Sequence, residues 1–289
     1  ATRGIGEETA KVLLDHGAHV VYAVRNVAKA EAAIAALPKH SGTATVIHLE
    51  LGDTDSVRSF AEAFLALNIP LHILVNNGGI MIPGGELQVG KGGHELHFEV
   101  NHLAHFLLTK LLEPKLLSSG TAASPARVIY VSTSGIELWN GPDADGGLKK
   151  QVPPTVDASR YHPLFAYCRS KVFNVFTAMA QQQRWGEDGR AISVALNPGL
   201  VPTGLLDQAG AIKGAFYDWP FVHAQKSVGQ GAATTIHAAL AAGVVREVRN
   251  GEFYYINSAP YTPGWVGGHP EWFNPELANE AWELTEAML

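Results

Sequence analysis

Tyr167 and Lys171 combine two residue types at a spacing that supports acid/base chemistry. Residues four apart on a helix share one face, so the phenol and the ammonium would point the same way. A cation within about 5 Å favours the phenolate and lowers the pKa of a tyrosine from its usual value near 10. A tyrosine tuned in this way can donate and accept protons near neutral pH. The pair therefore predicts proton transfer, with Tyr167 as the acid/base.

A cluster of hydroxyl side chains follows the short apolar run at residues 127–131. Ser132, Thr133 and Ser134 would lie at the end of a strand, where a hydroxyl can donate to a substrate oxygen as negative charge develops on it. The same residue types are common in turns whose hydroxyls bond only their own backbone. The residues alone leave both interpretations open.

Glycines at the start of the chain point to a phosphate-binding turn. Residues 1–6 read ATRGIG and come directly before a helix-like stretch, so backbone N–H groups and the helix N-terminus could approach a pyrophosphate. A plain helix-entry turn has the same composition. The strand and the first glycine that normally precede such a turn are not in the sequence, and we expect the natural chain to begin further upstream.

Two arginines lie where a dinucleotide would place its 2′ substituent. A site that prefers NAD has a carboxylate near the end of the second strand, which accepts from the ribose 2′-hydroxyl. Here Val24 is followed by Arg25, and Arg3 lies in the glycine turn. Two guanidinium groups would pair with a 2′-phosphate through charge-assisted hydrogen bonds, unless both are solvated surface arginines. The arginines favour NADP(H) as the cofactor.

Asparagines and glycines follow a third apolar run, at residues 74–79 (LVNNGG). Both residue types tolerate left-handed backbone and are common in plain turns. At the carboxyl edge of a parallel sheet, they would also let the chain pass close to a ribose.

Four histidines, His94, His97, His102 and His105, crowd one predicted helix. Their i, i+3 pairs are offset along the helix axis, and no cysteine or matched carboxylate completes a metal-binding set. We therefore expect no metal, and we place these histidines on the helix surface.

Apolar runs of strand length alternate with helix-like segments along the chain. The expected strands cover residues 19–24, 45–51, 71–75, 127–131 and 191–196. The amphipathic stretches between them cover residues 7–16, 27–36, 54–67, 94–117 and 165–185. This alternation predicts an α/β fold, a doubly wound parallel sheet with strands buried on both faces. Ligands bind at the carboxyl ends of the strands in such sheets.

Composition excludes several classes of function. The 289 residues carry a net charge of −6 without any long Lys/Arg run, which argues against nucleic-acid binding. No apolar stretch reaches the 18 residues of a spanning helix, and no leader opens the chain. A single cysteine, Cys168, fits a reducing compartment. We expect a soluble, cytoplasmic protein whose residues 1–289 form one domain.

Two segments interrupt the alternation. Residues 136–164 are rich in Gly, Pro and Asp, and residues 254–274 place aromatics among Gly and Pro. Long ordered loops are often functional, so each is a candidate for the floor of a substrate pocket, with surface padding as the alternative.

Together these motifs resemble the short-chain dehydrogenase/reductase family, in its retinol-dehydrogenase-like and WW-domain-oxidoreductase-like branch. The resemblance spans nearly the whole chain. The motifs that carry it are ATRGIG (1–6), AVRN (23–26), LELGD (49–53), LVNNGG (74–79), EVNHLAHFLLTKLL (99–112), RVIYVSTSG (127–135), YCRSK (167–171) and NPGLVPTG (197–204). It implies a single Rossmann-type domain that moves a hydride between NADP(H) and a carbonyl or alcohol.

The resemblance also implies roles for individual residues. Tyr167 would be the general acid/base, Lys171 would lower its pKa and bind the nicotinamide ribose, and Asn101 would hold a water for proton relay. The implied cofactor contacts are Thr2, Arg3, Gly4, Ile5 and Gly6 at the pyrophosphate; Arg25, with Arg3, at the 2′-phosphate and Asn26 beside it; Glu50 and Leu51 at the adenine; Asn77 and Gly78 at the adjoining ribose; and Pro198, Gly199, Val201 and Thr203 over the nicotinamide.

The chain departs from the family pattern at a few positions. The family usually has serine as the catalytic hydroxyl; strand alignment puts Thr133 there, whereas counting back from Gly135 favours Ser132. Glu50 replaces the usual Asp, Gly79 the usual Ala, and Ala104 the usual Gly. None of these changes removes a reacting group.

The expected substrate wall is apolar, which suggests a lipophilic ketone, aldehyde or alcohol. It would come from residues 136–164, residues 204–226 and the aromatic tail, with Trp139, Phe216, Tyr217, Trp219 and Phe221. In the resembled family the helices that hold Asn101 and Tyr167 commonly pair between subunits, so a homo-oligomer is an expected option.

Two other functions fit parts of the sequence. A sensor or scaffold that only binds the dinucleotide would not need Tyr167, Lys171 and a strand-end hydroxyl together. An epimerase or dehydratase of the extended branch shares the Tyr/Lys pair, but the GIG ending of the glycine turn and the chain length argue against it.

Overall fold

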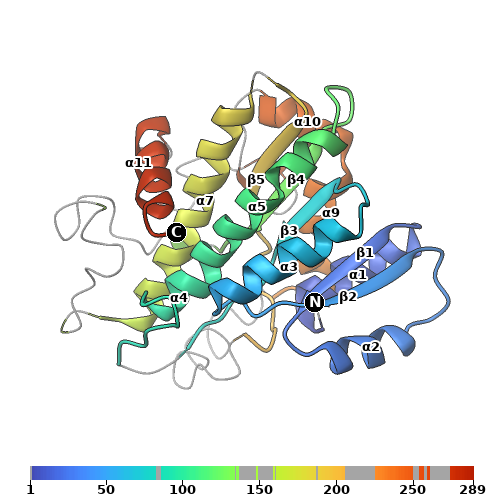
Figure 1. The fold of residues 1–289 in the computed structure, drawn as a ribbon, viewed down its shortest axis with the longest axis horizontal. Helices are drawn as coiled ribbons and strands as arrows, with labels where there is room; N and C mark the ends of the chain where they lie inside the picture. The colour runs from blue at the N-terminus through green and yellow to red at the C-terminus, as the bar shows by residue number, and fades with distance from the viewer. Residues whose placement is uncertain are drawn as a thin grey trace.

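The computed structural model describes residues 2–82, 86–133, 135–136, 148, 159, 161–186, 188–205, 225–249, 254–256, 259–260 and 274–289. In this part of the chain, strands lie between helices on both faces (Figure 1). The doubly wound α/β fold expected from the sequence is confirmed.

The strands described here form two sheets. β1 (His19–Val24) pairs in parallel with β2 (Thr43–His48). The second sheet has the order β3 (Ile73–Asn76), β4 (Ala126–Val131), β5 (Ala191–Asn197), β6 (Tyr254–Ile256) and β7 (Ala259–Pro260). Its pairs are parallel except the last, so the carboxyl ends of β3 to β6 meet at one edge.

Alternating side chains of the central strands pack into different helix layers. Val128 and Tyr130 of β4 belong to the core under one layer, whereas Ile129 and Val131 belong to the core under the other. The first layer contains α3 (Thr54–Ala66), α5 (Ala104–Ser119), α7 (Pro163–Trp185) and α11 (Pro275–Glu286). The second contains α1 (Gly4–Asp15), α9 (Val228–Leu240) and α10 (Ala242–Arg249), and α2 (Val27–Ala35) packs against β1 and β2.

Burial differs among the strands. β4 and β5 are almost wholly buried, whereas most residues of β1, β2 and β3 are only partly covered. The prediction that every strand is buried on both faces is wrong for these three in the described residues, since few of their residues are fully buried. The strand expected ahead of Thr2 lies outside the described residues.

α9 and α10 pack their apolar side chains against β4 and β5 in the second layer. Val244 and Val248 of α10 are buried against strand residues such as Ile192. Within the described ranges no single helix has the length and apolarity to cross a membrane; the pair α9–α10, bent by 72°, passes that test by length and composition.

α11 covers the outer face of α7 (Figure 1). Its Trp282 ring meets Phe106 edge-on, with centroids 4.6 Å apart, and the Arg184 guanidinium lies 4.4 Å from the Trp282 ring centroid. α11 therefore packs on both helices that carry the predicted catalytic residues or follow them, α7 and α5.

We expect Trp282→Ala to lower the free energy of unfolding by about 3–5 kcal/mol, because the ring is 5% exposed and fills the space between α11 and α5. Urea unfolding measures this loss. The matched control is Leu240→Ala, at a side chain 48% exposed, which should change stability by at most about 0.5 kcal/mol. Equal losses in both variants would contradict the packing role of Trp282.

Candidate active site

The Tyr167 phenol lies beside the hydroxyl that ends β4. Tyr167 is on the second turn of α7, is 8% exposed, and hydrogen-bonds the Thr133 hydroxyl. Ser132 is buried and donates to the Lys171 carbonyl at 2.9 Å, so its hydroxyl is already committed to the backbone. Of the two candidates, the structure places Thr133 next to the phenol. Ser134 lies outside the described residues.

Lys171 is one helical turn after Tyr167 and is also buried. Its Nζ donates to the carbonyl of Val131 at 2.9 Å, and burial lowers the pKa of this lysine to about 8. Burial also raises the pKa of Tyr167 above its ordinary value. Burial is the largest influence on the phenol, and the lowering of its pKa by Lys171 stays a prediction.

Asn101 lies close to Lys171, in a π-helical turn. The expected helix at residues 94–117 consists of α4 (Leu96–Phe98), the π-helix η1 (Glu99–Leu103) and α5. The Asn101 amide exchanges two hydrogen bonds with the Ile80 backbone, at 2.7 and 3.0 Å, and donates to Ser170 at 3.1 Å. A Cβ at Gly79 would lie 3.2 Å from Asn101 Oδ1 and 3.3 Å from Lys171 Nζ. The bare glycine therefore borders both polar groups.

The backbone carbonyl of Asn101 ends a line of hydrogen bonds that begins on α11. Thr285 Oγ1 lies 2.9 Å from His102 Nε2, and His102 Nδ1 lies 3.1 Å from Asn174 Oδ1. Asn174 Nδ2 in turn donates to the Asn101 carbonyl at 2.9 Å, and His105 Nδ1 donates to the same oxygen at 3.1 Å. A π turn frees such a carbonyl for side-chain donors. The water-holding role of Asn101 stays a prediction.

The N-terminus of α1 has the features of an anion site. Gly4 opens it with φ 64°, and no side chain caps its first turn, as is also true of α7. Uncapped N–H groups at a helix start suit a pyrophosphate. A Cβ at Gly4 would lie 3.2 Å from Thr203 Cγ2, and Ile5 and Val201 both approach Gly231. The segment after β5 thus lies against the glycine turn.

The residues expected at the adenosine half also come together in pairs. Arg25 Nε lies 3.7 Å from Glu50 Oε2, on an Arg25 side chain that is 80% exposed. Leu51 Cδ1 lies 2.6 Å from the position of a Cβ at Gly78. Asn26 uses its side chain within the protein, since Oδ1 accepts from the Lys29 N–H at 2.8 Å and caps α2.

The other expected cofactor residues border the same edge. They are Thr2, Arg3 and Gly6 around the start of α1, Asn77 after β3, and Pro198 and Gly199 after β5. Gly199 has φ 85°, and its N–H donates to Asn197 Oδ1 at 2.9 Å. Within the described residues, the predicted cofactor contacts thus follow β1, β2, β3 or β5 or lie at or just before the start of α1, apart from Lys171 on α7.

The structure corrects the view of the histidines. His97, His102 and His105 are 1%, 1% and 2% exposed, so the prediction of helix-surface histidines is wrong for them. Burial lowers the pKa of His102 and of His105 to about 3, so both are neutral. The available signal is the run VNHLAHFLL, because a helix that is apolar on all sides is a buried one.

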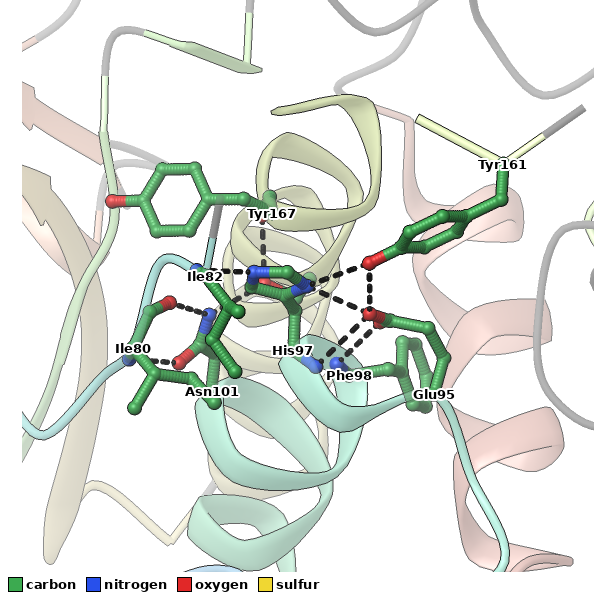
Figure 2. A network of polar contacts seen from close by, with 9 residues as sticks. Ile80, Ile82, Glu95, His97, Phe98, Asn101, Tyr161 and Tyr167 are labelled. Carbon is green, nitrogen blue, oxygen red and sulfur yellow. Dashed lines mark hydrogen bonds and ion pairs between the residues drawn. The ribbon is translucent and has the colours of Figure 1, made fainter. Parts of the chain in front are cut away.

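Sequence reasoning also missed Glu95 and Tyr161. With His97 they form a hydrogen-bonded network beside the Tyr167 ring, in which Glu95 and His97 are buried and Tyr161 is half-buried (Figure 2). Glu95 accepts from backbone N–H groups at the helix start, although glutamate is not one of the residue types usually found at this cap position. Its link to Tyr161 joins residues that are distant in the sequence.

Apolar side chains complete the surroundings of the phenol. Met81 and Cys168 are buried with Tyr167, and Leu164 and Leu205 pack against them. A buried phenol with a hydroxyl partner, an amide and an ammonium nearby can transfer a proton at the edge of the sheet.

Comparisons with known proteins agree with this geometry. The family model for short chain dehydrogenase matches residues 1–138. Human retinol dehydrogenase 12 is 36% identical over 293 residues, covering 100% of this chain and 84% of that protein. Human WW domain-containing oxidoreductase is 35% identical over 295 residues, covering 100% of this chain and 66% of that protein. The crystal structure of an uncharacterized protein from Mycobacterium paratuberculosis has a TM-score of 0.70 and 27% identity, covering 100% of this chain and 90% of that one. The chain belongs to the short-chain dehydrogenase/reductase family.

Proposed function

We propose that this chain is an NADP(H)-dependent oxidoreductase that interconverts a lipophilic carbonyl compound and its alcohol, with reduction as the favoured direction. The family is one of oxidoreductases that use NAD(H) or NADP(H). The observation that carries the proposal is the buried Tyr167 phenol on the Thr133 hydroxyl, at the sheet edge where the glycine turn also lies.

The residues at this edge fit a dinucleotide. The uncapped start of α1 offers N–H groups to a pyrophosphate, and Gly4 lies under Thr203, where a side chain would crowd the turn. Gly78 lies beside Leu51, where a ribose and an adenine would follow. A bound nicotinamide supplies the hydride.

Tyr167 supplies the proton in the proposed reduction. Because burial raises the pKa of this phenol, it keeps its proton at neutral pH and is ready to donate it to a carbonyl oxygen. Thr133 would donate a second hydrogen bond to the same oxygen as it gains charge. Alcohol oxidation needs the phenolate, which this environment disfavours.

The apolar contacts of Tyr167 support a lipophilic substrate. Met81, Leu164 and Leu205 surround the phenol side of α7, so the reacting carbonyl would lie among hydrocarbon side chains. The aromatic residues expected in the wall, from Trp139 to Phe221, lie outside the described residues.

The proposal is tested by following cofactor oxidation with a panel of aliphatic and aromatic ketones and aldehydes, with NADPH and NADH in parallel. We expect turnover to increase with the hydrophobicity of the substrate. At low cofactor concentration, turnover should be faster with NADPH than with NADH. Tight NADPH binding without oxidation by any carbonyl would favour the dinucleotide sensor or scaffold instead.

We expect Arg25→Ala to raise the KM for NADPH by about 10-fold and to leave the KM for NADH nearly unchanged. Loss of one charge-assisted hydrogen bond to a 2′-phosphate weakens binding by about this factor when the side chain is exposed, as that of Arg25 is. The matched control is Arg246→Ala, an exposed arginine on α10. An equal rise of both KM values in Arg25→Ala would contradict recognition of the 2′-phosphate.

A further inference from the structure

A buried carboxylate collects four hydrogen bonds next to the reacting phenol (Figure 2). Glu95 is 2% exposed, and Oε1 accepts from the His97 N–H at 3.1 Å, from His97 Nδ1 at 2.7 Å and from the Tyr161 hydroxyl at 3.2 Å. Oε2 accepts from the Phe98 N–H at 2.9 Å. Burial alone would raise the pKa of Glu95, but His97 and the N–H groups outweigh it and lower the pKa, so the group stays a carboxylate.

The second nitrogen of His97 is also used. Nε2 lies 2.9 Å from the backbone nitrogen of Ile82, which can only donate, so Nε2 is the unprotonated acceptor. Nδ1 then carries the single proton and donates it to Glu95. With both nitrogens occupied by protein partners, His97 has no free lone pair for general-base chemistry.

The network fixes three chain segments at one point. Tyr161 lies two residues before α7, which carries Tyr167. Glu95 and His97 open the helix that carries Asn101, and Ile82 lies on the segment that follows β3. The His97 ring meets the Tyr167 ring edge-on, with centroids 6.4 Å apart and an interplanar angle of 79°. The segment before α7, the helix of Asn101 and the segment after β3 are therefore held together through Glu95 or His97.

Stability alone gives a poor account of this arrangement. A buried charge together with its polar partners commonly contributes no more to stability than apolar side chains of the same volume. What Glu95 and His97 provide is direction, because each bond has one donor and one acceptor and the ring of His97 can take only one orientation. A rigid ring on one side of Tyr167 limits where its phenol can lie.

We propose that Glu95, His97 and Tyr161 are positioning residues for Tyr167, which hold its ring so that the hydroxyl reaches both Thr133 and the substrate oxygen. The role deepens the proposed function and rests on it. None of the three side chains touches the substrate oxygen; they act through the Tyr167 ring and through the segments on either side of it.

Paired variants of His97 test the proposal in the full chain. His97→Phe keeps a ring against Tyr167 but removes both polar atoms, whereas His97→Gln keeps one donor and one acceptor at a similar separation. We expect His97→Phe to lower kcat by about 10- to 100-fold, since small misplacements of a reacting group have effects of this size. His97→Gln should recover kcat to within about 5-fold of the wild type. In both variants, the Kd for NADPH measured by fluorescence should stay within about 2-fold.

Tyr161→Phe provides a milder variant that removes one hydroxyl. We expect a loss of about 3- to 10-fold in kcat without a change in the Kd for NADPH. The matched control is Tyr130→Phe, which removes a buried phenol hydroxyl bonded to Gln181 at 3.2 Å. This control should lose stability without losing kcat.

Two results would overturn the positioning role while the proposed function stands. One is a wild-type kcat in Tyr161→Phe together with a folded, fully active His97→Phe. The other is a loss of kcat that follows the melting temperature equally in all variants, Tyr130→Phe included. If the wild-type protein fails to oxidise NADPH with every carbonyl compound of the panel, the proposed function is contradicted, and this positioning role with it.

Discussion

Replacing Tyr167 with Phe is expected to reduce carbonyl reduction by about 10²- to 10⁴-fold, the usual contribution of a positioned general acid. The variant keeps the ring that packs against His97 and among apolar side chains, and loses only the hydroxyl bonded to Thr133. Because the protein would lose the proton donor but keep its cofactor contacts, the loss should appear in kcat. Steady-state NADPH oxidation and NADPH fluorescence titration measure the two effects separately.

The control for this experiment is Tyr22→Phe, at a buried tyrosine of β1 that packs in the core with α1. It removes the same atom from a tyrosine remote from Thr133, and its kcat should match the wild type. Retention of more than about a tenth of the wild-type kcat in Tyr167→Phe would argue that another group transfers the proton.

Lys171→Met should abolish activity. Its effect on the free energy of unfolding, relative to the wild type, should depend on pH. Burial lowers the pKa of Lys171 from 10.5 to about 8 in the folded, cofactor-free protein. Below pH 8 the ammonium is charged in both states, so the folded state bears the full cost of burying it. Between pH 8 and 10.5 the folded state releases the proton while the unfolded state keeps it, and folding becomes more favourable as pH rises.

The expected size of this effect is about 3 kcal/mol across that pH window, at roughly 1.4 kcal/mol per pKa unit. It is measured as the difference in unfolding free energy between wild type and Lys171→Met, by urea titration at several pH values, so that other titrating groups cancel. The same difference for Lys29→Met, at an exposed lysine of α2, should stay flat. A flat difference for Lys171→Met would show that the ammonium is solvated in the folded protein.

Local sequence pattern was enough to predict most helices and strands. Residues 19–24 were predicted as a strand and form β1 with the same bounds, because a short β-branched run between turns has few alternatives. The expected strand at residues 45–51 was shifted: β2 ends at His48, and Asp53 caps α3 with its side chain. The Glu50 N–H donates to the Ser56 hydroxyl of α3 at 2.9 Å rather than to a neighbouring strand, which accounts for the earlier end of β2.

The site was harder to predict in detail than the fold. The spacing of Tyr167 and Lys171 predicts a shared helix face, but the pKa of each depends on burial by elements far away in the sequence. The Glu95–Tyr161 hydrogen bond joins residues 66 apart, and no local pattern indicates it. The prediction of surface histidines was wrong for the same reason. His102 is buried by α7 and α11, which also supply its hydrogen-bond partners.

The line of hydrogen bonds from Thr285 through His102 and Asn174 to the Asn101 carbonyl gives α11 a direct mechanical connection to the interior. If α11 moves away, the buried, neutral His102 loses its hydrogen bond to Thr285. Its remaining bond, through Asn174, would then transmit the displacement to the π-helical turn that contains Asn101. For protein engineering, this makes the carboxy-terminal side an unsuitable place for rigid fusions or surface immobilisation. Any pull on α11 in a tethered enzyme would act on Asn101, which lies beside the Lys171 ammonium.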